Sequence, residues 1–371
     1  MNDAKSSMIL IGIGGAGSAA ARGVSRAFGP GLRYVLADTD AATGAEGEPF
    51  VLLGGDRLAG RGSGGDIPMA RLAAEDSRDA IDETLDGARL AVVVACLGGG
   101  TGTGATLAVA RHLRERGIPS IVFATIPFEF EGAGRRQNAT GIMSSIATEA
   151  SSSIFLPLDR LVAGEDNMES AMKRAVDTLA SGITLFWRMV ERPGYIRLDP
   201  ERVRRIVANA EGGRFAVATA QGPDRAAEVV DALSRSPLLA AGNTPARSIL
   251  CGILAGEDLR LSEVGRVAEG VKAAFGRSAN FDLATVNDEA TFSGRLSVVV
   301  FLFESGIRKD DDVSGGSADA PRLRRQRRPR NPLAQGPQGR GRFNNVEPTI
   351  NDSGVDLDTP TYLRQGVTLD A

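Results

Sequence analysis

The run GGGTGTG at residues 98–104 constrains the fold of this 371-residue chain more than any other feature. It follows an apolar segment, Leu90–Cys96, that predicts a buried strand, and it precedes a predicted helix over Ala105–Arg116. Glycine loses more conformational freedom on ordering than any other residue, so five glycines in seven positions are not a casual turn. Their backbone N–H groups and the two threonine hydroxyls can donate to phosphate oxygens. We therefore expect a strand–loop–helix unit that holds a phosphate.

A second glycine-rich loop, GIGGAGS at 12–18, follows the predicted strand Met8–Ile13 and opens a helix over Ser18–Phe28. Its G-x-G-x-x-G spacing is also the dinucleotide fingerprint, with Asp38 or Asp40 near the place of a ribose-binding acid. The same spacing fits a merely tight strand–helix turn. Neither loop carries the lysine of GxxxxGK[ST], which excludes a P-loop.

The rest of the first half alternates between predicted strands, such as Tyr34–Ala37 and Ser120–Thr125, and predicted helices, such as Ala70–Leu85 and Gly141–Ser151. This alternation predicts a parallel sheet with helices on both faces. Apolar residues in steps of three and four then predict one long helix over Asn167–Glu191. A second unit with its own strands and helices follows to about residue 305, and the chain beyond it cannot build a core.

Composition excludes several other classes of protein. Lys and Arg (43) nearly balance Asp and Glu (46), so no global basic field indicates nucleic acid. The two cysteines, Cys96 and Cys251, are far apart on apolar stretches and are expected to be buried small hydrophobes. No apolar stretch is long enough to cross a bilayer, and the N-terminus has no signal-peptide core. These features predict a soluble, cytoplasmic protein.

These motifs resemble the tubulin/FtsZ family, of which GGGTGTG is the signature. The resemblance to FtsZ, the bacterial tubulin homologue, covers roughly residues 7–305 and the tail. Further matching segments are ADTDA at 37–41, GRGSGGD at 60–66, AAED at 73–76, PFEFEG at 127–132, LDRL at 158–161, SPLL at 236–239 and DLRLSEV at 258–264. The resemblance implies a tubulin/FtsZ-like α/β fold: a parallel-sheet GTP-binding domain at 7–166, a central helix at 167–192 and a smaller α+β activation domain at 193–305. A linker at 306–345 and a partner-binding tail at 346–371 follow.

In this family the two loops hold GTP or GDP, with Mg²⁺. The residues implied to contact the nucleotide are Gly14, Gly15, Gly17 and Ser18 in the first loop and Gly98, Gly99, Gly100, Thr101, Gly102, Thr103 and Gly104 in the second. The loop Gly60–Asp66 is expected to close over the γ-phosphate, and Glu131 matches the acid near the sugar. The segment after Glu131 is one residue shorter than the family pattern. Either Arg135 or Arg136 is therefore expected at the phosphates, the alternative being a solvated surface arginine.

Hydrolysis in this family takes place between subunits, where acids from the loop after the long helix enter the neighbour's pocket. That loop reads PGYIRLDPER at 193–202, against a family pattern of Asn-x-Asp-x-x-Asp. Asp199 matches the middle acid and Glu201 is the candidate for the last one, since a carboxylate can orient and polarise water. Arg197 and Arg202 stand where the pattern has Asn and the final Asp, which predicts a slow GTPase.

The residues expected at the base also depart from the family. Met172 and Val176 stand where the long helix has its stacking Phe and its base-binding Asp, with Asp177 adjacent. Leu158 and Ala19 replace two asparagines. Because a lost polar contact in a buried site weakens specificity, guanine selectivity rests on the resemblance alone. Met172 fits simple helix packing equally well.

The leading hypothesis is a cell-division GTPase that polymerises head to tail into the filaments of the division ring, at the inner face of the membrane. The tail segment DLDTPTYLRQ, Asp356–Gln365, resembles the peptide with which FtsZ proteins grip membrane anchors. The arginines at 322–330 are read as part of a charged linker in preference to a nucleic-acid or lipid site. One alternative is a catalytically weak nucleotide-binding scaffold or regulator. Another is a nicotinamide-dependent dehydrogenase, for which the sole histidine, His112, is expected to be an ordinary surface residue.

Overall fold

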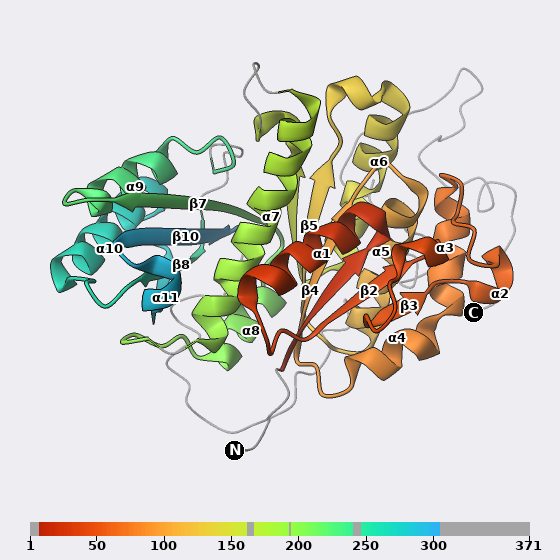
Figure 1. Cartoon of the computed structure of the whole chain (residues 1–371), viewed down its shortest axis with the longest axis horizontal. Helices are drawn as coiled ribbons and strands as arrows, with labels where there is room; N and C mark the ends of the chain where they lie inside the picture. Colours follow the sequence, from red (N-terminus) through yellow and green to blue (C-terminus); the bar gives the residue numbers. More distant parts are fainter. Residues whose placement is uncertain (1–6, 162–166, 193, 240–245, 305–371) are drawn as a thin grey trace, which may run out of the picture. The chain divides into compact units, whose positions relative to one another are not determined.

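Two β-sheets pack against opposite sides of one long helix, α7 (Met168–Glu191), in the computed structural model of the chain (Figure 1). The structure describes residues 7–161, 167–192, 194–239 and 246–304. Pro193, the predicted linker at 306–345 and the predicted tail at 346–371 lie outside these ranges. No helix within them is long and apolar enough to cross a lipid bilayer.

The first sheet has six strands in the order β3-β2-β1-β4-β5-β6, and every neighbouring pair is parallel. The strands are β1 (Met8–Ile13), β2 (Tyr34–Asp38), β3 (Phe50–Leu52), β4 (Leu90–Cys96), β5 (Ser120–Ile126) and β6 (Ser152–Pro157). Successive side chains of a strand point to opposite faces. Leu10 of β1 therefore joins the core under one set of helices, while Ile9 and Ile11 join the core under the other.

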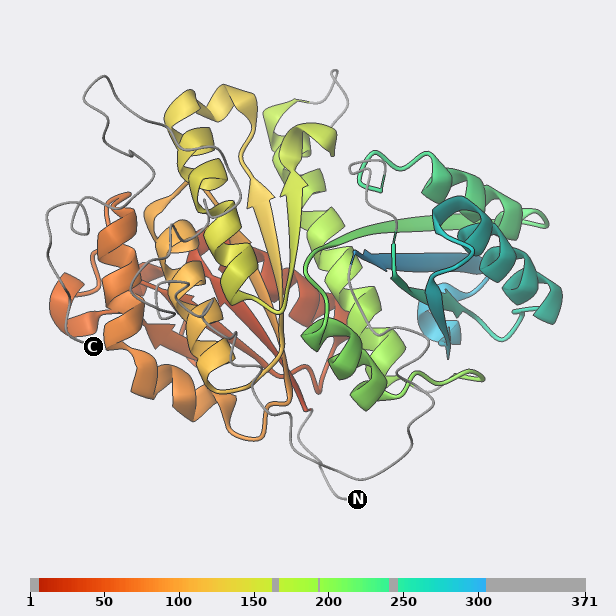
Figure 2. The same ribbon diagram turned by 180° about the vertical axis from the view of Figure 1, so that it is seen from behind.

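Helices cover both faces of this sheet, as the sequence predicts (Figures 1 and 2). With α7, α1 (Gly14–Phe28) and α8 (Pro200–Ala208) cover one face. The other face is covered by α3 (Ile67–Asp76), α4 (Arg78–Leu85), α5 (Gly100–Glu115) and α6 (Ala133–Glu149). A short α2 (Gly55–Leu58) precedes α3.

The predicted single helix over Ala70–Leu85 is wrong, because the chain breaks at Ser77 into α3 and α4. The Ser77 hydroxyl donates to the Ala73 carbonyl at 2.9 Å and accepts from the Gly54 N–H at 2.8 Å. A side chain that bonds to nearby backbone in this way competes with helix continuation.

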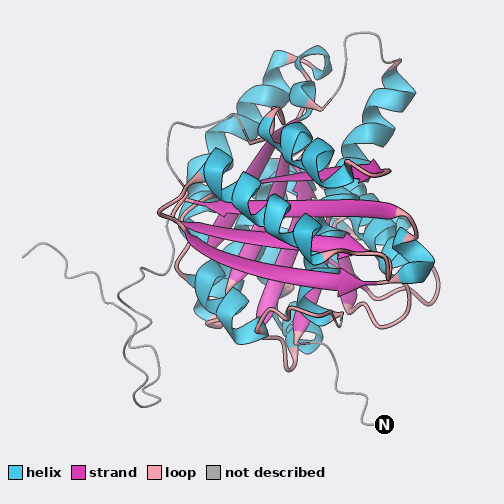
Figure 3. Ribbon diagram, turned by 90° about the vertical axis from the view of Figure 1, so that its left-hand side faces the viewer, coloured by secondary structure: helices cyan, strands magenta, loops and turns pink. Residues whose placement is uncertain are grey.

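The second sheet has the order β7-β10-β8-β9 and is mixed. Its strands are β7 (Gly213–Gln221), β8 (Ser248–Ala255), β9 (Asn280–Asn287) and β10 (Arg295–Phe303). β10 is antiparallel to both neighbours, and β8 and β9 are parallel. Two helices, α9 (Arg225–Ser234) and α10 (Leu261–Phe275), cover its outer face, which is toward the viewer in Figure 3. A short α11 (Glu289–Phe292) precedes β10.

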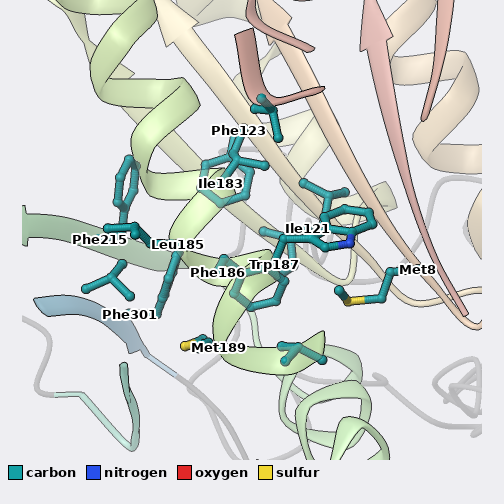
Figure 4. Packing of buried hydrophobic residues seen from close by; sticks show 14 of the residues in the cluster. Met8, Ile121, Phe123, Ile183, Leu185, Phe186, Trp187, Met189, Phe215 and Phe301 are labelled. Atoms are coloured by element: carbon teal, nitrogen blue, oxygen red, sulfur yellow. The ribbon is translucent and has the colours of Figure 1, made fainter. Parts of the chain in front are cut away.

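The largest core lies around α7 and joins both sheets. Trp187 is fully buried and lies beside Met8 and Ile121 of the first sheet (Figure 4). Phe186 meets Phe301 of β10 edge-on, with ring centroids 5.2 Å apart. Helix α7 can approach β7 closely because residue 182 is a glycine: a Cβ there would overlap the ring of a β7 phenylalanine. The first and second sheets are thus held by one continuous apolar core.

Arg225 at the start of α9 ties three segments of the second unit together. Its guanidinium bonds to Asp258 Oδ2 at 2.7 Å and to both oxygens of Glu263, in the first turn of α10, at 2.7 and 3.1 Å. The Arg225 side chain is only 5% exposed and that of Glu263 12%. The hydrogen bond from Arg225 lowers the pKa of the Glu263 carboxyl below its ordinary value of 4.5.

Candidate nucleotide site

Both glycine-rich loops meet at the carboxyl ends of two adjacent strands, β1 and β4. The helices that follow them, α1 and α5, cover opposite faces of the sheet. This is the point where the strand order reverses, and ligands of open parallel sheets bind in the crevice there. A cavity of about 450 Å³ opens at this point, within the size range of small-molecule sites.

The first turns of α1 and α5 carry unsatisfied N–H groups at the cavity. Neither helix has a side-chain N-cap, and neither has an acidic residue in its first turn. The first N–H groups of a helix have no partner inside it, and the helix dipole adds partial positive charge at that end. Two such helix ends side by side form an anion site of the kind that binds phosphates.

The glycines of the two loops serve two different purposes. A Cβ on Gly102 would overlap the Cys96 carbonyl oxygen, and one on Gly104 would overlap the Ile67 carbonyl oxygen. A Cβ on Gly17 would come within 2.5 Å of the Val94 carbonyl oxygen. These glycines let α1 and α5 lie directly on their neighbours. Gly15 and Gly99, in contrast, have nothing within 4 Å of a Cβ and border the cavity.

The cavity is lined by only part of the residue set implied for nucleotide contact. Its walls include Gly14, Gly15, Gly99, Gly100, Thr101, Gly102, Glu131 and Arg135. The predicted contacts Gly17, Ser18, Gly98, Thr103, Gly104 and Arg136 are instead placed behind these walls or beside them. Ser18 and Thr103 are completely buried. The Thr103 hydroxyl accepts from the Gly98 N–H at 2.8 Å, so it shapes the loop from inside.

A third loop, Gly60–Asp66, contacts the second glycine-rich loop. A Cβ on Gly100 would overlap the Ser63 hydroxyl, so the two loops touch. Gly62, Ser63, Gly64 and Gly65 line the cavity, as the expectation of a loop over the phosphates requires. The Asp66 side chain caps α3 by accepting from the Met69 N–H at 2.8 Å, and it ends the loop there.

Glu131 and Arg135 form an ion pair at the cavity wall, with Arg135 Nη1 2.8 Å from Glu131 Oε2. The other Glu131 oxygen accepts from the Phe128 N–H at 3.0 Å. Arg136 is turned toward Asp159 at 2.8 Å. Of the two arginines left open by the sequence, Arg135 is therefore the one that lines the cavity.

The wall opposite the glycine loops is apolar. It consists of Leu158, which begins a single 3-10 turn (Leu158–Arg160), and of four residues of α7: Met172, Ala175, Val176 and Leu179. We call this set the α7 wall. Asp177 is exposed, pairs with Lys173 at 2.7 Å and does not line the cavity; it borders hollows between α7 and the second sheet. The α7 wall thus offers contact area to a flat ring and no hydrogen-bonding side chain.

The expectation of a buried Cys96 needs correction, because its side chain is only half-buried and lines the cavity. Burial nevertheless raises the pKa of the Cys96 thiol. Cys251 is fully buried, as expected, and burial raises the pKa of its thiol to about 12.

The features that suggested a dehydrogenase have other roles. Asp38, at the end of β2, accepts from the Thr39 N–H and the Thr43 hydroxyl, each at 2.7 Å, so both carboxylate oxygens are engaged in shaping the loop. Asp40 accepts from the Ala42 N–H at 2.9 Å. The prediction of a surface His112 is wrong: it is 5% exposed and bonds to Asp82 at 2.8 Å.

Asp199 and Glu201, the predicted catalytic acids, lie at the other end of the first sheet. They border a small depression beside Met8 and Leu90, the amino ends of β1 and β4. Asp199 caps α8 by accepting from the Glu201 N–H at 3.0 Å. Glu201 pairs with Arg204 and, at 3.0 Å, with Arg89, and the hydrogen bond from Arg204 lowers the pKa of its carboxyl.

Sequence reasoning missed α8, which turns the second half of the predicted catalytic loop into helix. Its start has a recognisable signal, Asp199-Pro200-Glu201, a capping residue followed by proline at the first helical position. Arg202, in the first turn of α8, faces the second sheet and bonds to Asp282 at 3.2 Å. It therefore does not stand free at the surface, whereas Arg197 is exposed.

Fold and site together define a class: a nucleotide-binding protein that holds phosphates on glycine loops and helix ends without a P-loop lysine. The family model "Tubulin/FtsZ family, GTPase domain" matches residues 7–164, and "FtsZ family, C-terminal domain" matches residues 214–304. The "Cell division protein FtsZ" of Coxiella burnetii is 32% identical over 364 residues, which cover 96% of this chain and 87% of that protein. That of Pseudomonas aeruginosa is 32% identical, covering 84% of this chain and 82% of that protein. The chain belongs to the FtsZ family of cell-division GTPases.

Solved structures show the same fold. "FtsZ dimer, empty (M. jannaschii)" superimposes with a TM-score of 0.75 at 24% identity, covering 80% of this chain and 87% of that one. "CetZ2 from Haloferax volcanii - GTPgS bound protofilament" superimposes with a TM-score of 0.66 at 24% identity, covering 81% and 94%. These matches confirm the predicted tubulin/FtsZ-like fold, and the family assignment sets the dehydrogenase hypothesis aside.

Proposed function

We propose that this chain hydrolyses GTP between two copies of itself, stacked head to tail in a filament that serves cell division. One observation carries the proposal: the cavity and the acids Asp199 and Glu201 lie at opposite ends of the same sheet. The 24 residues of α7 span about 36 Å between these ends, so a chain cannot bring its own acids to its own nucleotide. Head-to-tail stacking is the arrangement that joins the two, and it does not close on itself.

The residues at the cavity fit a nucleoside triphosphate. The N–H groups of the first turns of α1 and α5 bind phosphate oxygens, the open sides of Gly15 and Gly99 leave room for them, and Arg135 adds positive charge. Among the described residues, no group of three or more Asp, Glu, His or Cys is arranged to hold a metal. Mg²⁺ bound with the nucleotide would neutralise charge on the phosphate oxygens.

The catalytic part falls to Asp199 and Glu201 of the next copy, which orient and polarise a water molecule. Both acids are engaged within their own chain, Asp199 as a helix cap and Glu201 by two arginines. Activity therefore requires that a water reach the second carboxylate oxygen of Asp199 or that stacking release Glu201. This is the physical reason to expect slow turnover, in addition to the arginines at 197 and 202.

GTP hydrolysis measured against protein concentration, with Mg²⁺ present, tests the proposal. We expect the rate per chain to rise above a threshold concentration, because the active site is complete only between copies. A constant rate per chain at all concentrations would overturn the shared site. Bound GTP with no turnover at any concentration would mean that the chain is a nucleotide-gated scaffold.

A mixing experiment serves as the control. Asp199→Asn removes an acid from one end, and Gly99→Asp places a carboxylate among the phosphates at the other, where a side chain has open space. Each variant alone is expected to be inactive. An equimolar mixture regains activity if the acids work on a neighbour's nucleotide, and it stays inactive if they work within one chain.

We further propose that the tail segment Asp356–Gln365 binds a membrane anchor or another division protein and so keeps the filament at the division site. What supports this is its alternation of acids and apolar residues, typical of segments that order on a partner. Deleting residues 346–371 is expected to leave GTP hydrolysis unchanged and to disperse the fluorescently tagged protein from the division site. Retention of the truncated protein at that site would contradict the proposal.

A further inference from the structure

The α7 wall bears on which base the cavity accepts. All five of its residues are apolar, and three of them, Leu158, Ala175 and Leu179, are almost fully buried. Leu158 and Ala175 pack with Phe128 in a small core of their own behind the wall. The wall is thus a fixed apolar surface, with Met172 as its exposed and flexible edge.

Several polar side chains elsewhere around the cavity are already engaged. Thr39 and Thr101 bond to one another at 2.7 Å, and the carboxylate of Asp38 is held by the Thr39 N–H and the Thr43 hydroxyl. Both oxygens of Glu131 have partners, Phe128 N–H and Arg135. Asp40 also lines the cavity and accepts from the Ala42 N–H through one oxygen; it lies on the loop after β2, so none of these carboxylates belongs to the α7 wall.

Asp177 does not fill this gap, although it is the next residue after Val176. Successive helical residues point about 100° apart, so Val176 reaches the cavity while Asp177 does not, although both border a second hollow between α7 and the second sheet. Asp177 is bonded to Lys173, and it borders a groove shared with Thr178 and with Val217 of β7, on the side of α7 toward the second sheet. α7 itself is well anchored in the large core, which fixes this orientation.

We infer that this site binds purine nucleoside triphosphates through their phosphates and the flat face of the base, with little preference for guanine over adenine. The inference rests on the proposed function and concerns the selectivity of the same site. An apolar wall contacts guanine and adenine rings over similar areas. It makes no hydrogen bond that would distinguish the donors and acceptors of one base from those of the other. Strong discrimination needs buried polar groups that the wrong base leaves unpaired, and the α7 wall has none.

Competition binding on the full-length wild-type chain tests this directly. A fluorescent GTP analogue is bound in the presence of Mg²⁺ and displaced with GTP or ATP, so no hydrolysis is needed. We expect the two dissociation constants to agree within about tenfold. GTP bound more than about 100-fold more tightly than ATP would overturn the inference and leave the proposed function intact. Failure of both nucleotides to bind would overturn the inference and the proposed function together.

A variant supplies the missing recognition. Val176→Asp adds to the α7 wall a carboxylate that accepts from guanine N1–H and the 2-amino group and repels the lone pair on adenine N1. The ratio of ATP to GTP dissociation constants is expected to rise by about tenfold or more, because hydrogen bonds to charged groups are the strong ones. The matched control, Thr178→Asp, adds the same charge to the same helix in the groove between α7 and β7, away from the cavity, and leaves the ratio unchanged.

Val176 also packs against the large core, so Val176→Asn provides a neutral version that places less strain on folding. Its amide is expected to raise the same ratio by a smaller factor. Thermal unfolding of each variant establishes that it is folded before binding is compared. An unchanged ratio in a folded Val176→Asp protein would show that the base does not lie on the α7 wall, which overturns the inference.

Discussion

Replacing Gly102 with alanine is expected to abolish nucleotide binding and to lower the free energy of unfolding by about 3 kcal/mol. The added methyl group would overlap the carbonyl oxygen of Cys96, the last residue of β4. Backbone cannot move aside as a flexible side chain can, so the first turn of α5 must shift away from the sheet. That shift displaces the N–H groups of α5 that form the anion site. Urea unfolding and titration with a fluorescent GTP analogue measure the two effects.

Gly99→Ala is the matched variant, one turn earlier in the same loop. Nothing lies within 4 Å of a Cβ at Gly99, and its backbone is extended, so alanine fits the fold. We expect unfolding close to that of the wild type and weaker nucleotide binding, because the methyl group occupies cavity space. If both variants unfold like the wild type, the close approach of α5 to β4 is not as described.

Replacing Arg225 with methionine is expected to lower the free energy of unfolding by about 3–5 kcal/mol, as breaking one side of a buried ion pair does. Methionine keeps much of the side-chain volume, so the loss reflects charge and hydrogen bonding. Glu263, almost enclosed, would be left without its guanidinium partner. Arg57→Met is the control: it removes an ion pair of similar geometry, Arg57 with Asp76, that is largely exposed to solvent. It is expected to change stability far less.

The effect of Arg225→Met depends on pH in a defined direction. The folded-state pKa of Glu263 lies below its ordinary value of 4.5, so its contribution is present above that value. The contribution is lost as the pH falls through the lowered pKa. The stability difference between wild type and variant is therefore expected to shrink as the pH is lowered from 7 toward 3, in urea unfolding followed by circular dichroism. A difference that stays constant over this range would mean that Glu263 is not the partner that matters.

The architecture was predictable because long elements carry strong periodic patterns. The strands Met8–Ile13 and Leu90–Cys96 have the same bounds in sequence and structure, and the predicted Asn167–Glu191 differs from α7 only in its capping residue. Short or polar elements were missed: β3 has three residues, and β9 mixes polar with apolar side chains. α1 and α5 begin earlier than predicted because their glycines, poor helix formers, form the first turn at the phosphate site.

The site was predictable as a location and less so in its residues. Motifs place the glycine loops at one edge of the sheet, but they do not say which side chains face the cavity. Ser18 and Thr103 lie within the motifs and are nevertheless buried, because each stands in the first turns of a helix, on the face that packs against the rest of the fold. The choice between Arg135 and Arg136 depended on Asp159, which is distant in sequence. Only tertiary packing decides such questions.

The fluorescence of the single tryptophan of this chain reports on the packing between α7 and the first sheet. Trp187 is wholly enclosed between α7 and the first sheet, and its emission therefore comes from one named place in the molecule. Light emitted from so dry an environment lies toward the blue, and it shifts to the red when water enters. A change in emission during assembly or nucleotide exchange would thus mean that the packing of α7 against the first sheet has loosened. A steady emission would mean that filaments form and disperse while this packing stays intact.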